Sequence, residues 1–219
     1  MGRPEPAADS SSPSAKLRVQ SLDRSGTIGK LRLELSDGSS FSFLESSLVE
    51  CGFTSLALEP GVELEGEEVL RLAELACASQ LHERALRLLA VSAHSTRGLE
   101  RKLLTRGAEP GLLAAELARL TNAGLLDDRS YAEAWVRLRL ARHPEGPGPL
   151  LAGLLRRGVP RELAEQAVRS QLTEEAERAG AAALAEKLRR RSDMTPERLH
   201  ATLARRGFRR GLIRELLGE

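Results

Sequence analysis

The chain has 219 residues, of which 41% are hydrophobic and 29% are charged, and its net charge is +2. This length suffices for one large core or for several small ones. We expect no membrane span, since no run of eighteen apolar residues occurs and the N-terminus lacks a signal-peptide pattern. Cys51 and Cys77 each lie in an apolar pattern, which argues against a disulfide framework and favours a cytoplasmic protein.

The charge is divided unevenly along the chain. Residues 1–80 hold 7 lysines and arginines against 13 acids, whereas residues 81–219 hold 26 against 18. Apart from Lys102 and Lys187, the cations of the second part are arginines, whose planar group suits carboxylate and phosphate. We therefore expect an anionic partner; the alternative is that these arginines only solvate helix surfaces.

The N-terminal part is predicted to be a tail followed by a small α/β module. Residues 1–15 lack periodicity and are expected to be disordered. In residues 16–80, apolar residues alternate around a turn at Asp37-Gly38, which predicts a β-hairpin or meander. Ser46 or Ser47 is expected to cap a short helix that ends at Gly52. The acidic run from Glu63 to Glu68 predicts the start of another helix.

Beyond about residue 80 the spacing is helical, and the pattern repeats around Gly107, Gly158 and Gly207. In each copy an arginine precedes the glycine, leucines stand eight and four residues before it, and apolar residues stand five and ten after it. The matching columns are Arg106, Arg157, Arg206; Leu99, Leu150, Leu199; Leu103, Leu154, Leu203; Leu112, Leu163, Leu212; and Leu117, Val168, Leu217.

These columns predict a helix-turn-helix in each copy, with the glycine in a left-handed conformation at the turn. A leading helix is expected before each, over about residues 84–91, 129–140 and 174–190. The fold class is therefore mainly α: tandem three-helix repeats (81–126, 127–172 and 173–219) that form an elongated, curved array after the N-terminal module. Helix starts are expected at Ser95, at Asp127 or Asp128 with a Ser130/Glu133 capping box, at Pro160 and at Thr195.

Residues 124–137, GLLDDRSYAEAWVR, resemble the signature of the RecX family, as does the helix end from Leu154 to Val159. The motif residues carried over are Asp127, Asp128, Tyr131 and Trp135, together with the three repeat glycines. The chain departs from the family in two places. Family members usually have basic residues directly after a Gly-Pro, whereas no Lys or Arg directly follows Pro147 here. Gly98 stands at the position where an acidic residue would complete the Ser95 capping box.

The resemblance implies a regulator that binds the RecA filament on single-stranded DNA and restrains its ATPase, strand-exchange and co-protease activities. This places the chain in homologous recombination, DNA repair and the SOS response. We expect a monomer with weak affinity for single- or double-stranded DNA, no cofactor and no enzyme activity. One alternative is a general basic helical-repeat DNA-binding protein; another is a scaffold whose binding is insensitive to salt.

Candidate partner- or DNA-binding residues are the cations near the repeat glycines and in the motif helix. They are Arg101, Lys102, Arg106, Arg137, Arg139, Arg156, Arg157, Arg205, Arg206, Arg209 and Arg210. We expect no catalytic residues or metal ligands, because the four histidines form no triad and the adjacent Asp127 and Asp128 are typical of a helix cap. Tyr131 and Trp135 share a helix face and are interpreted as repeat core, or else as an exposed partner-binding pair.

Overall fold

The computed structural model describes residues 16–25, 29–50, 52–53, 58–192 and 194–218, so the predicted tail at 1–15 lies outside the described residues. The chain divides into two compact units, residues 1–84 and 85–219. The division falls inside one long helix, α2 (Gly66–Val91). Each unit is described separately below.

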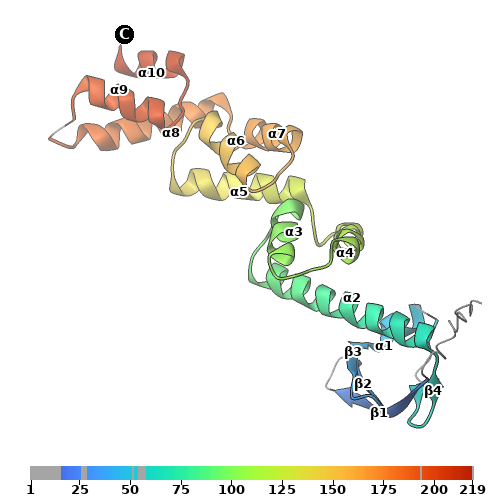
Figure 1. Cartoon of the computed structure of the whole chain (residues 1–219). Coiled ribbons are helices and arrows are strands. Elements are labelled where there is room, and N and C mark those ends of the chain that lie inside the picture. Colours follow the sequence, from blue (N-terminus) through green and yellow to red (C-terminus); the bar gives the residue numbers. More distant parts are fainter. Residues whose placement is uncertain (1–15, 26–28, 51, 54–57, 193, 219) are drawn as a thin grey trace, which may run out of the picture. The chain divides into compact units, whose positions relative to one another are not determined.

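The first unit contains an antiparallel sheet with strand order β3-β2-β1-β4 (Figure 1). Its strands are β1 (Leu17–Ser25), β2 (Lys30–Leu35), β3 (Ser40–Leu44) and β4 (Glu63–Leu64). The predicted hairpin at Asp37-Gly38 joins β2 to β3: Gly38 has φ +84°, and Asp37 Oδ1 accepts from Ser39 N at 2.9 Å. Strand β4 was not predicted, because two residues are too few to show alternation.

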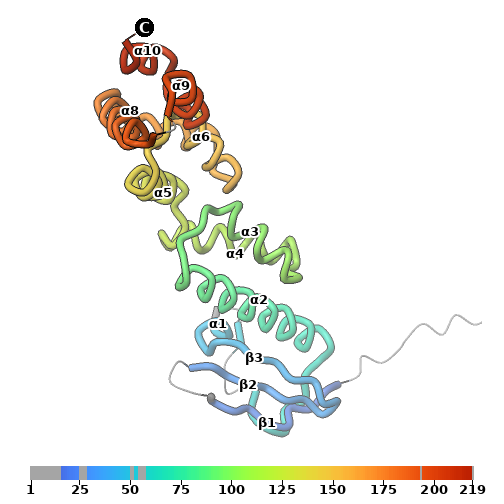
Figure 2. The backbone as a smooth tube through the Cα atoms, turned by 90° about the vertical axis from the view of Figure 1, so that its left-hand side faces the viewer, coloured from blue at the N-terminus to red at the C-terminus, as the bar shows by residue number. Residues whose placement is uncertain are grey.

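Helices complete this unit. Helix α1 (Glu45–Glu50) begins before Ser46 and Ser47, so neither serine is its cap, and Gly52 follows it at φ +79° as expected. Helix α2 runs along the sheet (Figure 2), and Leu72 and Leu75 join Leu31 and Leu33 in the core. The acidic run was wrongly placed in one helix: Glu63 belongs to β4, and only Glu67 and Glu68 occupy the first turn of α2.

The described residues of the second unit form helices and the turns that join them. Its helices after α2 are α3 (Thr96–Leu104), α4 (Pro110–Asn122), α5 (Asp128–Arg142), α6 (Pro147–Arg156), α7 (Arg161–Gln171), α8 (Glu174–Arg189), α9 (Pro196–Arg205) and α10 (Arg210–Leu217). The tandem three-helix organisation is confirmed: α5–α7 share one core cluster and α8–α10 share another. The leading helix of the first repeat is the end of α2, not a separate helix over 84–91.

The repeat columns correspond to buried positions and tight turns. The leucines eight and four residues before each glycine are at most 2% exposed. Gly107, Gly158 and Gly207 have φ of +80°, +84° and +78°, the left-handed conformation that the pattern predicts. The column five residues after the glycine is only half-buried; Leu113, Ala164 and Ile213, one residue later, are the buried set.

Two expectations about helix starts need correction. Asp127 is the N-cap of α5 and accepts from Arg129 N and Ser130 N, so Ser130 lies inside the helix and forms no capping box with Glu133. Ser95 caps α3 although Gly98 replaces the acidic residue of a capping box. A Cβ at Gly98 would lie 2.8 Å from Ser95 Oγ and 3.4 Å from Arg157 O, so the close packing there favours glycine.

Candidate functional site

The start of α3 packs against the turn between α6 and α7, which joins the first repeat to the second. Ser95 Oγ caps α3 by accepting from Gly98 N at 3.0 Å, and it also donates to Arg157 O. Thr96 N donates to Asp128 Oδ1 at 2.7 Å. Because these bonds join residues 32 and 62 apart in sequence, they fix the side chains of α3 relative to Arg157.

A hollow of about 480 Å³, here called the basic hollow, lies beside this junction. Four cations line it, three from α3 and the residues after it and one from the end of α6, and no carboxylate does. The lining residues are His94, Ser95, Gly98, Arg101, Lys102, Thr105, Arg106, Tyr131 and Arg157. Arg101, Lys102, Arg106 and Arg157 are all candidates from the sequence, so the fold brings four of the eleven together.

Within the described residues, none of these four cations forms an ion pair with a carboxylate. Their contacts are to neutral groups: Arg101 Nη2 donates to Arg156 O at 3.2 Å, and Arg157 Nη1 donates to Gly153 O at 3.0 Å. Lys102 Nζ lies 3.3 Å from His94 Nε2. Guanidinium and ammonium groups without a local counter-charge can bind carboxylates or phosphates.

The surroundings of His94 in the basic hollow disfavour its protonated form. Burial lowers the pKa of its imidazole below the ordinary 6.5, and the charge of Lys102 lowers the pKa further. Both effects favour the neutral imidazole, whose Nε2 can accept from Lys102. The sequence does not single out His94, since nothing in its local pattern reveals that α3 folds back beside it.

Three other candidate arginines are paired within the protein. Arg139 donates two bonds to the buried Glu145, Nη2 to Oε1 at 2.7 Å and Nε to Oε2 at 3.1 Å, and Arg206 Nη1 lies 3.6 Å from Glu145 Oε1. Arg209 Nε lies 2.8 Å from an oxygen of Glu177, which is 2% exposed. These bonds neutralise the three arginines and connect helices within the second unit.

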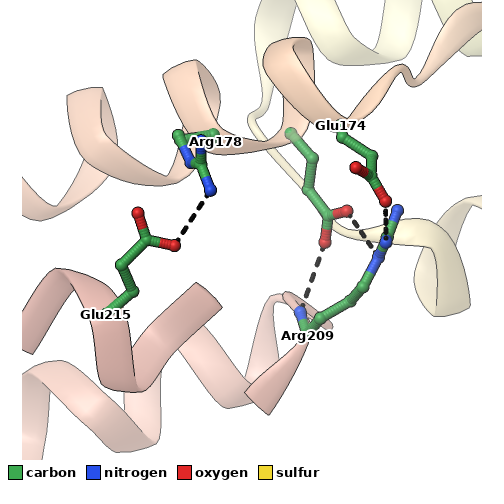
Figure 3. A network of polar contacts seen from close by, with 5 residues as sticks. Glu174, Arg178, Arg209 and Glu215 are labelled. Carbon is green, nitrogen blue, oxygen red and sulfur yellow. Dashed lines mark hydrogen bonds and ion pairs between the residues drawn. The ribbon is translucent and has the colours of Figure 1, made fainter. Parts of the chain in front are cut away.

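Figure 3 shows the surroundings of Arg209. Its side chain points toward Glu174 of α8, and its Nη1 lies 3.0 Å from Glu174 Oε1. Beside it, Arg178 of α8 pairs with Glu215 of α10 at 3.0 Å. These partners cannot be inferred from the sequence pattern, because each pair joins residues at least 30 positions apart.

The remaining candidates are dispersed. Arg156, Arg205 and Arg210 are exposed, and Arg205 Nη2 lies 3.3 Å from Thr202 Oγ1. Arg137 is also exposed, on α5, and does not line the basic hollow. The eleven candidates thus form no single surface, and the four in the basic hollow are the group that the fold gathers without acidic partners.

The motif residues have mainly structural positions. Trp135 packs on the core of the second repeat, where a Cβ at Gly153 would lie 2.4 Å from its Cη2, and Arg157 Cζ stacks 4.5 Å from its ring centroid. Tyr131 also packs on this core but reaches the basic hollow. The bond from Ser130 Oγ is the main reason that the pKa of the Asp127 carboxyl lies below its usual range.

Two further properties concern only the described residues. No group of three His, Cys, Asp or Glu side chains there is arranged to hold a metal ion. None of the helices in that part of the chain is long and apolar enough to cross a bilayer.

Comparisons with known proteins agree with this architecture. A family model described as "RecX, second three-helix domain" matches residues 127–168. A protein named "Regulatory protein RecX" from Mycolicibacterium smegmatis is 39% identical over 141 residues, which are 60% of this chain and 74% of that protein. One with the same name from Treponema pallidum is 39% identical over 133 residues, 61% of this chain and 80% of the relative.

Solved structures show the same fold. A structure titled "Crystal structure of regulatory protein RecX" superposes with a TM-score of 0.75 at 22% identity, and the match covers 93% of this chain and 100% of that one. The RecX structure from Lactobacillus salivarius has a TM-score of 0.60 at 23% identity over 65% of this chain and 95% of its own. The matched relatives are named as regulatory proteins, not as enzymes.

Proposed function

This chain belongs to the RecX family, and from that premise we propose that it regulates RecA by binding the RecA filament on single-stranded DNA. In this proposal it lowers the ATPase, strand-exchange and co-protease activities of the filament, and so acts in homologous recombination, DNA repair and the SOS response. It works in the cytoplasm as a monomer and has no enzyme activity or cofactor of its own.

The mechanism we propose is occupancy. Successive repeats contact successive subunits of the filament, so that several weak contacts combine into useful avidity and hinder the addition or rearrangement of subunits. Weak binding to the DNA in the filament adds to these contacts.

The basic hollow is the observation that carries the proposal at the level of residues. Arg101, Lys102, Arg106 and Arg157 line it together, and none has an acidic partner among the described residues. Such a group pays no cost of breaking an internal ion pair when an anionic surface binds. We therefore assign the first filament contact to this hollow rather than to the paired Arg139, Arg206 and Arg209.

A general DNA-binding function is less well supported. Base reading by repeated helix-turn-helix units would use similar residues at the start of each second helix. Those helices begin at Pro110, Arg161 and Arg210, which present different side chains.

The test is DNA-dependent ATP hydrolysis by the cognate RecA, with this protein added from far below RecA to equal stoichiometry and DNA in excess. We expect hydrolysis to fall at substoichiometric ratios, because one bound regulator affects a filament of many subunits. A fall that appears only when this protein saturates the DNA would instead favour competition for DNA.

Two double variants test whether the filament is contacted through the basic hollow. Lys102→Glu with Arg106→Glu should raise the concentration needed for half-inhibition about tenfold or more, since two charges facing the partner change sign. Arg84→Glu with Arg142→Glu changes the net charge equally at exposed arginines outside the hollow and should inhibit normally. Equal inhibition by both variants would exclude the basic hollow as the contact.

A further inference from the structure

A second hollow, of about 570 Å³, lies next to the basic hollow and has a different character. We call it the apolar hollow, because leucines and alanines from the end of α2, the turn before α5 and α5 itself form most of its lining. It is lined by Leu86, Leu89, Ala90, Ala93, His94, Gly124, Leu125, Asp127, Ser130, Tyr131 and Ala134. Leu86 is 38% exposed and Leu125 is 51% exposed, so large apolar side chains face solvent here.

The two hollows adjoin, since His94 and Tyr131 line both. On one side of these two residues are four cations, and on the other are apolar side chains. The one carboxylate on the apolar side, that of Asp127, is already engaged: it accepts from Arg129 N and Ser130 N at the start of α5 and from Ser130 Oγ at 2.7 Å. The carboxylate keeps its negative charge, but it lies on the apolar side, and no carboxylate lines the basic hollow itself.

We propose that the two hollows together receive a short segment of a partner protein in which acidic residues are followed by a large apolar residue. The acidic side chains face Lys102, Arg106 and their neighbours, while the apolar side chain covers Leu86 and Leu125. This inference rests on the proposed function in taking the partner to be a protein, and it adds the chemistry of the segment that binds.

Both halves of the surface gain from such a segment. Carboxylates match the planar groups of Arg101, Arg106 and Arg157, which lack acidic partners among the described residues. An apolar side chain removes exposed leucine surface from water, which is favourable in proportion to the area buried. Ionic contacts then set orientation and the apolar contact adds affinity, as in interfaces with an apolar centre and a charged rim.

A nucleic-acid strand fits the pair of hollows less well. Phosphates could occupy the basic hollow, but among the described lining residues only Tyr131 and His94 carry aromatic rings, so stacking of a run of successive bases has little support. The leucines of the apolar hollow would stay exposed beside a charged backbone. Nucleic acid is therefore the competing outcome of the test.

The experiment uses the full chain and fluorescence anisotropy. The probe is a fluorescein-labelled peptide in which a run of Asp and Glu is followed by Leu-Phe; in the control peptides, Ser-Ser replaces Leu-Phe or Lys replaces the acids. Labelled oligothymidylate is the nucleic-acid arm. We expect the acidic–apolar peptide to bind about tenfold or more tightly than either control peptide. Equal binding of the peptides, no binding of any, or tighter binding of oligothymidylate overturns the proposal.

Variants assign the binding to the two hollows. Leu125→Asp should weaken peptide binding about tenfold, whereas Leu138→Asp, at a leucine that is 62% exposed on α5 outside both hollows, should not. Lys102→Glu with Arg106→Glu should weaken it similarly. Circular dichroism of each variant verifies that the helices are intact, and wild-type binding by Leu125→Asp would contradict the proposal.

Inhibition of RecA by the same proteins separates this inference from the proposed function. If the wild type inhibits RecA but does not bind the peptide, the acidic–apolar segment is wrong and the function stands. If it binds the peptide as expected but does not inhibit RecA, the function is wrong and the inference about the hollows stands.

Discussion

At the residue scale, arginines of this chain differ in what they can do although they look alike in the sequence. Arg106 and Arg206 precede equivalent glycines, yet Arg106 faces the basic hollow without an acidic partner and Arg206 lies near Glu145. A charge in contact with a buried carboxylate contributes to folding, and one that faces solvent is available to a partner. Reversing Arg205, Arg206, Arg209 and Arg210 together would therefore combine both effects, and it would test the binding surface poorly.

Glu145 is the buried carboxylate that pairs with two of the candidate arginines, Arg139 and Arg206. Its carboxylate is buried and accepts two bonds from Arg139, so Glu145→Gln should lower the free energy of unfolding by about 1–3 kcal/mol through loss of charge-assisted bonds. The matched control is Glu215→Gln, whose pair with Arg178 is exposed on both sides and is expected to contribute about 0–1 kcal/mol. Urea unfolding of both variants checks this; a larger loss for Glu215→Gln would contradict the assignment.

At the element scale, the three repeat turns share a backbone conformation but not an environment. A Cβ at Gly158 would lie 2.6 Å from Arg97 Cβ, and one at Gly207 would lie 2.2 Å from Pro149 Cδ. At Gly107 nothing lies within 4 Å. The turns of the second and third repeats are therefore each packed against the start of a helix from the preceding repeat. The turn of the first repeat has no such contact at Gly107.

Alanine substitutions should reveal this difference. Gly107→Ala should cost about 1–2 kcal/mol, the cost of the left-handed conformation alone. Gly207→Ala carries the same cost and adds overpacking against the rigid Pro149 ring, typically about 1–3 kcal/mol more. Thermal unfolding of the two variants under identical conditions measures the difference, and equal shifts in Tm would mean that the third turn is not packed as described.

At the scale of the whole molecule, charge is segregated along the chain. Residues 1–80 contain 7 cations against 13 acids, and residues 81–219 contain 26 against 18. Interactions between exposed charges weaken as salt shortens the screening length, which is about 8 Å at physiological ionic strength. Binding through the basic surface of the second unit should therefore depend on salt.

We expect the concentration needed for half-inhibition of RecA to rise with added potassium chloride, over a range in which RecA alone keeps its ATPase activity. Lys102→Glu with Arg106→Glu should show a smaller dependence, because fewer favourable ionic contacts remain to be screened. Inhibition that does not change with salt would point to a scaffold that binds through apolar faces alone.

The sequence by itself determined the repeat, the helix-turn-helix in each copy and most helix ends. These features follow local rules: apolar spacing sets which face of a helix is buried, and a glycine supplies the left-handed turn. Gly107, Gly158 and Gly207 were identified on this basis, and their φ angles confirm it. The β-hairpin at Asp37-Gly38 was predictable for the same reason, whereas the two-residue β4 was not.

Only the tertiary structure decided which cations are available to a partner. Glu145, in the loop between α5 and α6, neutralises Arg139 and Arg206, and Glu177 of α8 neutralises Arg209. The packing of α3 on the second repeat brings Arg157 to the α3 cations. The choice of ionic partner depends on distances in space between residues far apart in the chain, and a periodic pattern holds no information about those distances. The candidate arginines could therefore be named from the sequence. Only their positions in the fold distinguish those paired with buried carboxylates from those that line the basic hollow.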